Sequence, residues 1–340
     1  MADVVPKRIL VTGALGFVGA AVTRRLVLAG HHVVALTSGK ADRADLLDRP
    51  DQVDQRDQSS RTDPGGDPLP PGSVEIASGD VRDDAAMRRV VRGVDGVCHL
   101  AALTRVRESF DAPELYLDVN AAGTRTLLAA AESEAERTGR PLPFVQASTG
   151  SVYGTPERQP ITEQTSPAPT NPYGESKLAA DRAALAAAET GRLGVVVLRA
   201  FNVAGAAGGR GDRDLTRIIP KALAVARGDE PLLEINGDGG AVRDFVHVDD
   251  LARAYVLALG HAAGGGAVFN VGATRASVAD IVATVEQVTG RVLPVRHLPP
   301  RAEPQILVAD STRIGVELGW KPEQSSLVDI VTSAWSAYRS

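Results

Sequence analysis

The chain has 340 residues, of which 44% are hydrophobic, and its formal net charge is −5. This length allows one or two domains with a sizeable core, and the lack of a basic excess argues against a nucleic-acid-binding protein. Its single cysteine, Cys98, cannot form an internal disulfide, which fits a reducing compartment. The first residues lead into a strand without an apolar signal-peptide region, and no uncharged apolar run is long enough for a bilayer. We therefore expect a cytoplasmic protein.

The chain begins with alternating strand and helix patterns. A β-rich run at residues 8–12 ends at a glycine-rich loop, a helical pattern covers 17–29, and a second β-rich run covers 32–36. Strand, glycine turn, helix and strand in this order begin a doubly wound parallel sheet. Residues 48–72 interrupt the alternation with a stretch rich in Pro, Gly, Asp and Gln, which predicts a mobile surface loop.

After this insertion the alternation resumes and continues to about residue 200. The expected strands are 74–77, 96–101, 143–148 and 194–199, and the expected helices are 85–92, 113–137 and 171–189. The pattern predicts an α/β fold with a doubly wound parallel sheet, the Rossmann architecture, in residues 1–200. Beyond Phe201 the alternation breaks down, so we expect residues 201–340 to form a smaller substrate-binding lobe, with 241–275 returning to the first domain.

The glycine-rich loop VTGALGFVG is a candidate nucleotide site. Gly13, Gly16 and Gly19 stand between a strand and a helix, where they permit a tight turn and close approach of a pyrophosphate to the helix N-terminus. A purely structural turn is the alternative. The second strand ends in Thr37 instead of an acidic residue, and Lys40 follows, so the motif leaves NADP open beside NAD.

Three further residues are candidates for catalysis. Tyr173 and Lys177 are spaced to lie one turn apart on the same face of a helix, and a hydroxyl residue, Thr149, precedes them. A nearby ammonium favours the ionised phenol, so this pair can supply a tyrosine base. A buried aromatic beside a solvated lysine is the alternative. No spacing of His, Cys and carboxylate residues is typical of a metal site.

Longer motifs resemble a known family. The segments GALGFVG, GDVRD at 79–83, HLAA at 99–102, ASTGSVYG at 147–154 and NPYGESK at 171–177 are similar to those of extended short-chain dehydrogenases/reductases. LRAFNVAG, VRDFVHVDDLARAY and ELGWKP resemble the nucleotide-sugar branch, most of all UDP-glucose (UDP-galactose) 4-epimerases. The resemblance covers nearly the whole chain outside residues 48–72.

The resemblance implies which residues form the site. The implied catalytic residues are Thr149, Tyr173 and Lys177. The implied cofactor contacts, for NAD, are Gly13, Gly16, Phe17, Val18, Gly19, Thr37, Asp80, Val81, Leu100, Ala101, Ala102, Asn120, Tyr173, Lys177 and Phe201. The implied substrate contacts are Thr149, Tyr173, Asn202, Arg217, Arg243, Arg301 and Leu307.

Some of the implied substrate residues have ordinary alternatives. Arg243 could pair with a neighbouring aspartate, and Arg217 could be a surface charge. Forked arginine donors nevertheless suit the phosphate oxygens of a nucleotide sugar. Leu307 corresponds to the position beside the sugar's C2, where a leucine implies UDP-glucose and UDP-galactose as main substrates and weaker turnover of N-acetyl sugars.

The residues after Thr149 bear on the type of reaction. Nucleotide-sugar dehydratases place an acidic pair there for acid–base chemistry, whereas this chain has Gly150 and Ser151, which cannot transfer a proton near neutral pH. The expected reaction is therefore C4 epimerisation through a 4-keto sugar. Alternatives are an NADP-dependent 4-ketosugar reductase, an epimerase for UDP-GlcNAc or UDP-glucuronate, and a non-catalytic dinucleotide sensor.

The helices at 113–137 and 171–189 have alanine-rich faces that allow close helix packing. The resemblance implies that two copies of the chain pair through these helices as a homodimer. The alternative is that alanine packs them only on their own sheet.

Overall fold

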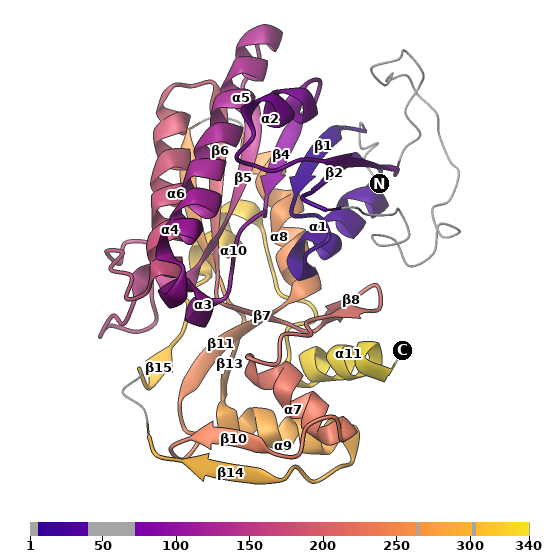
Figure 1. Cartoon of the computed structure of the whole chain (residues 1–340), viewed down its shortest axis with the longest axis vertical. Helices are drawn as coiled ribbons and strands as arrows, with labels where there is room; N and C mark the ends of the chain where they lie inside the picture. Colours follow the sequence, from indigo (N-terminus) through magenta and orange to yellow (C-terminus); the bar gives the residue numbers. More distant parts are fainter. Residues whose placement is uncertain (1–5, 40–71, 263–264, 301–303, 340) are drawn as a thin grey trace. The chain divides into compact units, whose positions relative to one another are not determined.

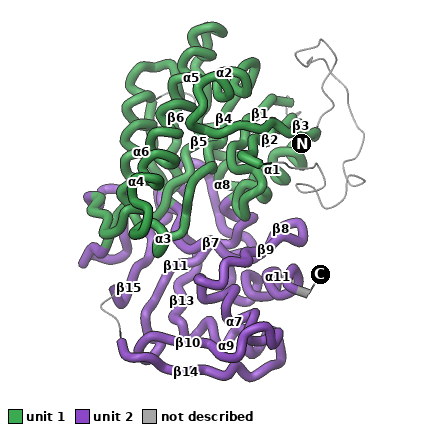
Figure 2. The backbone as a smooth tube through the Cα atoms, viewed as in Figure 1, with its two compact units in different colours: residues 1–154, 167–199, 252–269 green, residues 155–166, 200–251, 270–340 purple. Residues whose placement is uncertain are grey.

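The computed structural model describes residues 6–39, 72–262, 265–300 and 304–339. All of the expected loop at 48–72 except Gly72 lies outside these residues. The chain divides into two compact units (Figure 2). Unit 1 contains Met1–Gly154, Pro167–Arg199 and Ala252–Phe269, and unit 2 contains Thr155–Ser166, Ala200–Leu251 and Asn270–Ser340.

Unit 1 is built around a seven-stranded sheet (Figure 1). Its strands are β1 (Arg8–Thr12), β2 (His32–Thr37), β3 (Val74–Ser78), β4 (Gly96–His99), β5 (Leu142–Thr149), β6 (Leu193–Ala200) and β12 (Gly266–Val271). They lie in the order β12-β6-β5-β4-β1-β2-β3. The ladders that join β1, β2, β3, β4 and β5 are all parallel. The expected doubly wound parallel sheet is confirmed.

Helices cover the two faces of this sheet. Apolar residues of α2 (Asp84–Val91), α5 (Gly123–Thr138) and α6 (Pro172–Glu189) share one buried cluster with side chains of the sheet. Val97 of β4 belongs to this cluster, whereas its neighbour Cys98 points to the opposite face, because side chains alternate along a strand. That face contacts α1 (Phe17–Leu28), which packs on β1 and β2, and α8 (Val248–His261), whose Leu259 lies beside Gly96.

The helical stretch expected at 113–137 has an irregular centre. It consists of α4 (Pro113–Tyr116), the π-helical segment η3 (Leu117–Ala122) and α5, and α3 (Val106–Asp111) precedes it. A π segment adds a residue to the turn and is often found at functional sites. Here it contains Asn120, which is 1% exposed.

Unit 2 contains three small sheets and several helices. Its strands are β7 (Asn202–Ala204), β8 (Ala206–Ala207), β9 (Arg210–Gly211), β10 (Leu233–Asn236), β11 (Val242–His247), β13 (Thr274–Ser277), β14 (Val295–Leu298) and β15 (Ile306–Leu307). Strand β11 pairs with β13, β15 and β7, β10 pairs with β14, and β8 pairs with β9. The helices are α7 (Ile218–Arg227), α9 (Val278–Thr289), α10 (Thr312–Leu318) and α11 (Leu327–Arg339).

The core of unit 2 lies between helices α7, α9 and α11 and the sheet of β11. It includes Leu223, Phe245, Ile281 and Ile330. In the described parts of both units, no helix is long and apolar enough to cross a membrane.

Candidate functional site

The loop after β1 is shaped by its glycines. Gly13 has a φ of +67°, and a Cβ there would lie 2.8 Å from the backbone nitrogen of Ala101. A Cβ on Gly19 would lie 2.1 Å from the carbonyl oxygen of Gly13. Both glycines are therefore needed for the chain to fold back on itself, whatever the loop binds.

Gly16 has a different surrounding. It is exposed, it is the N-cap of α1, and it has no side chain to accept hydrogen bonds from the first turn. The first N–H groups of a helix, here those of Phe17, Val18 and Gly19, have no partner within the helix. Together with the positive end of the helix dipole, they form a site suited to a phosphate group.

A chain of buried hydrogen bonds begins at the end of β1. The Thr12 hydroxyl oxygen accepts from the N–H groups of Leu100 and Ala101 at 3.1 and 3.0 Å, and it lies 2.7 Å from His99 Nδ1. With its lone pairs occupied, the hydroxyl must donate to Nδ1. His99 Nε2 then carries the proton and donates to Thr124 Oγ1 at 2.9 Å. Burial, aided by the charge of Lys177, lowers the pKa of His99 to about 3, in agreement with a neutral ring.

The same chain of hydrogen bonds continues to helix α6. Thr124 Oγ1 donates to the carbonyl oxygen of Asn120 at 2.6 Å. The Asn120 amide donates to Ser176 Oγ at 2.9 Å, and Ser176 Oγ donates to the carbonyl oxygen of Tyr173 at 2.7 Å. The carboxyl end of β1 and helix α6 are thereby connected through a continuous set of hydrogen-bonded polar groups.

Tyr173 and Lys177 lie in the first turns of α6, as the spacing predicts. The helix begins with Pro172 at N1 and with Asn171 as N-cap, whose Oδ1 accepts from the N–H of Gly174 at 2.8 Å. Tyr173 is half-buried, and the ring of Tyr116 meets it edge-on with centroids 6.4 Å apart.

Lys177 is 4% exposed. Burial lowers the pKa of its ammonium to about 8, although the nearby charge of Asp181 opposes this. Among the described residues we find no hydrogen-bond acceptor for this ammonium. A largely buried cation without a hydrogen-bond partner in the protein is costly, so its position suits a ligand that would accept its hydrogen bonds.

Thr149 is the last residue of β5. Its Oγ1 accepts from the N–H of Ser151 at 3.2 Å and thereby caps the short 3₁₀ helix η4 (Gly150–Tyr153). This bond fixes the oxygen and leaves the hydroxyl proton for another acceptor. Gly174 at the start of α6 packs close to the Ser151 carbonyl, so a Cβ there would lie 2.8 Å from it. Thr149, Tyr173 and Lys177 thus belong to adjoining elements of unit 1.

Other expected cofactor residues are held by interactions of their own. Asp80 is bound by Arg82, whose guanidinium also reaches Asp118 at 2.7 Å, and hydrogen bonds from Arg82 lower the pKa of Asp80. The side chain of Val81 lies in the core of unit 1. Thr37 donates its hydroxyl to the carbonyl oxygen of Gly39 at 2.8 Å. Lys40, expected to favour NADP, lies outside the described residues.

In unit 2 the expected substrate residues Asn202, Arg243 and Leu307 lie on one sheet. Arg243 of β11 is the partner of Leu307 of β15, and Asn202 of β7 is the partner of Phe245, two residues further along β11. The Asn202 amide donates to the carbonyl oxygen of Asp244 at 2.8 Å. Phe201, expected at the cofactor, immediately precedes β7, and its N–H donates to the carbonyl oxygen of Val271.

The carboxylate of Asp244, which follows Arg243 in the chain, already accepts hydrogen bonds from other residues. The Asp244 carboxylate accepts from the N–H groups of Ala273 and Ala309 at 2.7 and 2.9 Å, and burial raises its pKa. Its place is tightly enclosed, because a Cβ on Gly272 would lie 2.5 Å from the carboxylate carbon. Asp244 therefore holds β11 against the loops beside it.

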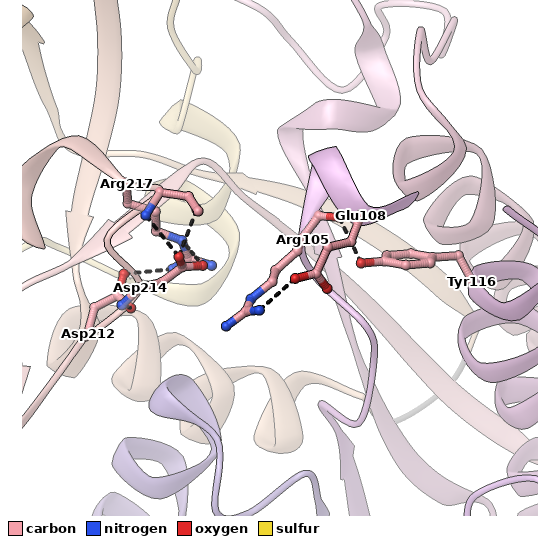
Figure 3. A network of polar contacts seen from close by, with 7 residues as sticks. Arg105, Glu108, Tyr116, Asp212, Asp214 and Arg217 are labelled. Atoms are coloured by element: carbon pink, nitrogen blue, oxygen red, sulfur yellow. Dashed lines mark hydrogen bonds and ion pairs between the residues drawn. The ribbon is translucent and has the colours of Figure 1, made fainter. Parts of the chain in front are cut away.

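Arg217 stands at the N-cap of α7 and pairs with its own loop (Figure 3). Its guanidinium lies 2.9 Å from Asp212 Oδ2 and 3.9 Å from Asp214 Oδ2, and its side chain is 41% exposed. Arg301, the remaining expected substrate residue, lies outside the described residues.

Unit 2 also contains a hollow that the sequence did not indicate. It encloses about 760 Å³ at the carboxyl ends of the parallel strands β10 and β14. Its described lining consists of Asn236, Gly237, Asp238, Ala241, His297, Leu298, Pro300 and Gln305. Scattered polar residues without a motif give no signal in a sequence. Throughout the described ranges, no three His, Cys, Asp or Glu residues are placed to hold a metal ion.

Comparison with known proteins agrees with this arrangement. The model of the NAD dependent epimerase/dehydratase family matches residues 9–272. The chain belongs to this family. Within it, the UDP-glucose 4-epimerase of Streptomyces lividans is 37% identical over 97% of this chain and 96% of its own length.

Solved structures align with nearly the whole chain. A UDP-glucose 4-epimerase from Stenotrophomonas maltophila, with bound NAD and formylated UDP-arabinopyranose, has 29% sequence identity and a TM-score of 0.84. The alignment covers 98% of both chains. A UDP-glucose 4-epimerase from Bifidobacterium longum, in complex with NAD+ and UDP, has 29% identity and a TM-score of 0.82 over 98% of both chains. The family resemblance expected from the sequence is confirmed.

Proposed function

We propose that this protein is an NAD-dependent nucleotide-sugar 4-epimerase that interconverts UDP-glucose and UDP-galactose. The observation that carries the proposal is the set of Thr149, Tyr173 and Lys177 without any carboxylate at positions 150 and 151. UDP-glucose 4-epimerases similar to the chain over nearly its full length support it. We assign cofactor binding to residues 1–200 and sugar-nucleotide binding to residues 201–340.

Unit 1 has the features that an NAD cofactor requires. The open N-terminus of α1 at Gly16 suits the pyrophosphate, and the unsatisfied ammonium of Lys177 suits the hydroxyls of a ribose. The loop from Leu100 to Ala102, held by Thr12, would lie along the cofactor, with Asn120 beside it. NAD+ would take up the hydride from C4 of the sugar and return it.

The residues of unit 1 have separate roles in this reaction. Tyr173 removes the proton from the C4 hydroxyl, and the positive charge of Lys177 favours its ionised form. Because the Thr149 oxygen is fixed by Ser151, its hydroxyl proton can hydrogen-bond the sugar oxygen as the charge there changes. Tyr173 returns the proton after the keto sugar has presented its other face.

The surroundings of Thr149 favour epimerisation over the elimination of water. Elimination needs an acid and a base at two neighbouring carbons. Gly150 has no side chain, and the Ser151 hydroxyl does not ionise near neutral pH. Only proton and hydride exchange at one carbon can therefore be served by this set of residues.

In unit 2 we assign nucleotide-sugar binding to Asn202, Arg243 and Leu307, with Arg217 as a further candidate. The register that pairs Arg243 with Leu307 supports this assignment, since one side chain suits phosphate and the other an apolar face of a sugar. Arg217 would have to exchange its bonds to Asp212 and Asp214 for bonds to a ligand. We assign the same function to Arg301 from the resemblance alone.

Two measurements test the proposed function. The purified protein is first denatured and the released nucleotide is weighed by mass spectrometry; NAD is expected. The protein is then incubated with UDP-glucose or UDP-galactose, and also with UDP-GlcNAc and UDP-glucuronate, without added reductant. Interconversion of the first pair is expected, with slower turnover of the N-acetyl sugar. Release of NADP together with net oxidation in each turnover would identify a reductase instead.

Tyr173→Phe provides the matched control for this test. The variant lacks only the ionisable oxygen, so we expect it to keep its fold and its nucleotide and to lose nearly all activity. A rate above about one hundredth of wild type would contradict the assignment of Tyr173 as the base, because a general base commonly contributes about 100-fold or more.

A further inference from the structure

A buried ionic network lies one helical turn beyond Lys177. Asp181, which is 0% exposed, accepts through Oδ2 from Ser148 Oγ at 2.9 Å and from Arg199 Nε at 3.0 Å. Arg199 also donates to the Tyr153 hydroxyl at 2.9 Å, and its guanidinium lies 4.9 Å from the centre of that ring. All of these residues belong to unit 1.

Only one of the two carboxylate oxygens of Asp181 accepts hydrogen bonds from the described residues. Both donors bind the same oxygen, and the other oxygen, Oδ1, is buried without a hydrogen-bond partner among the described residues. Burial raises the pKa of this carboxyl, which Arg199 opposes. A buried oxygen without a hydrogen-bond partner is costly. In a purely structural ion pair we would expect both carboxylate oxygens to accept hydrogen bonds.

The buried charge one helical turn before Asp181 is the ammonium of Lys177. Residues four apart lie on the same face of a helix, and the charges of Lys177 and Asp181 attract each other. The network therefore contains two cations and one carboxylate, and the carboxylate alone offsets the burial of Lys177. Without it the ammonium would be stranded in the core.

We propose that Asp181, anchored by Arg199 and Ser148, is a positioning residue that keeps Lys177 charged and thereby keeps Tyr173 ionisable. The inference rests on the proposed function, because it assigns Tyr173 as the base. Asp181 contacts neither sugar nor cofactor in this view. It acts through the ammonium one turn before it.

Other ionisable groups lie near Lys177 or near the residues it acts with, and none can replace Asp181. His99 on β4 interacts with Lys177, Tyr116 on α4 and Tyr255 on α8 interact with Tyr173, and Tyr153 on η4 is bonded to Arg199 on β6. His99 is neutral, Arg199 carries the wrong sign, and burial raises the pKa values of Tyr116 and Tyr255. Against the effect of burial, the ion pair with Arg199 at 3.0 Å and the hydrogen bond from Ser148 favour the charged form of the Asp181 carboxyl.

The test measures ionisation of Tyr173 without relying on turnover. Ultraviolet difference titration of the NAD-bound protein against its Tyr173→Phe variant gives the midpoint of this one tyrosine. In Asp181→Asn the midpoint should rise by about one pH unit, the size of shift that a single nearby charge produces. The rate near pH 7 should then fall about 10-fold and recover as the pH is raised.

Matched variants separate electrostatics from structure. Ser148→Ala removes one donor to the same oxygen but no charge, so the midpoint should stay near that of wild type. Asp181→Glu keeps the charge and should restore most of the wild-type midpoint. If Asp181→Asn does not fold, the double variant with Arg199→Met removes the stranded guanidinium and should still raise the midpoint.

The possible results have distinct meanings. An unchanged Tyr173 midpoint in a folded Asp181→Asn protein, or in the double variant, would overturn the inference and leave Asp181 with a structural role. The proposed function would still stand if wild type interconverts its sugars and Tyr173→Phe does not. An inactive wild-type protein would instead count against the proposed function.

Discussion

At the scale of single residues, the site contains charged and polar groups that are almost fully buried. Lys177 has its charge in the core, and His99 is held neutral between two threonines. Such groups lower the stability of the empty protein and become useful when a ligand supplies their missing partners. The cost of burying Lys177 can therefore be measured.

Lys177→Met should stabilise the nucleotide-free protein at neutral pH. The pKa of Lys177 falls from 10.5 in the unfolded chain to about 8 in the fold. The unfolded state thus binds more protons between these values, and wild-type stability rises with pH across this window. The penalty is fully present below pH 8 and gone above 10.5, and it amounts to about 3 kcal/mol.

Urea unfolding from pH 7 to 10.5 checks this expectation. The free energy of unfolding of Lys177→Met should exceed that of wild type at pH 7, and the difference should shrink as the pH rises. The variant should also lose bound NAD and activity. A difference independent of pH would show that Lys177 is not desolvated in the protein in solution.

At the scale of elements, two departures from regular helix geometry position the site. The π segment η3 places Asn120 where it can bond both the loop at Leu103 and Ser176 of α6. The uncapped start of α1 leaves its first N–H groups open to a ligand. Of the loop glycines, only Gly16 has a backbone conformation and surroundings that would accept a side chain with a small adjustment.

Gly16→Ala should therefore reduce cofactor retention without unfolding the protein. Its new Cβ would lie 3.2 Å from the Gly13 carbonyl oxygen, which is tight but tolerable, and it would sit at the entrance to the helix N-terminus. We expect a change in the free energy of unfolding below about 1 kcal/mol and a clear loss of co-purified nucleotide.

Two further glycine variants serve as controls for Gly16→Ala. Thermal unfolding measures the stability of each variant, and a nucleotide assay measures its bound cofactor. Gly19→Ala should destabilise severely, because its Cβ would overlap the Gly13 carbonyl. Gly260→Ala in α8, with no atom within 4 Å of the new Cβ, should stabilise by up to about 1 kcal/mol and keep its nucleotide. Full nucleotide content in Gly16→Ala would argue against a pyrophosphate at this turn.

At the scale of the whole molecule, distant segments of unit 2 are joined through one carboxylate. The Asp250 carboxylate accepts hydrogen bonds from the N–H groups of Glu323 and Gln324, at 2.9 and 2.8 Å. Asp250 also accepts from Ser325 Oγ at 2.6 Å. Its carbonyl oxygen accepts from the Trp320 indole at 2.9 Å. Segments about 75 residues apart in the chain are thereby held together, and the run VHVDD has a structural role.

Asp250→Ala should destabilise unit 2 by about 3 kcal/mol, because the buried Ser325 hydroxyl and two part-buried backbone N–H groups lose their acceptor. Chemical unfolding followed by the fluorescence of Trp320 and Trp335 measures it. As a control in the same unit, Asp280→Ala breaks only the exposed capping box of α9 and should cost about 1 kcal/mol. Equal losses in the two variants would contradict the role given to Asp250.

The assembly of two chains is a prediction at this same scale. Large apolar side chains of unit 1 are exposed on α3, α4 and the start of η3, namely Val106, Phe110, Leu115 and Leu117. Such a grouping fits the expected homodimer through the helices at 113–137 and 171–189. Light scattering should give twice the chain mass of 35.5 kDa for wild type. Leu115→Glu should shift it toward monomer, whereas Val316→Glu on α10, which is also exposed, should not.

The sequence by itself determined the order and type of most elements of unit 1. Strands β1 and β2 are β-rich runs around a glycine turn, and the spacing from Tyr173 to Lys177 is a property of any helix. These signals depend only on residues close together in the sequence, so they can be recognised without knowing which segments pack against them. The register of β11 and β15 could not be predicted in this way, because β15 has only two residues and pairing depends on distant partners.

Tertiary structure alone decided which polar residues act together. Asp181 is four residues after Lys177, but its bonds to Ser148 and Arg199 come from β5 and β6, which meet α6 only in the fold. In the same way, two threonines 87 and 25 residues away in the chain decide which nitrogen of His99 carries the proton, and burial keeps the ring neutral. Burial changes the energy of a charge by several kcal/mol, and burial is a property of the packed chain and not of any segment in it.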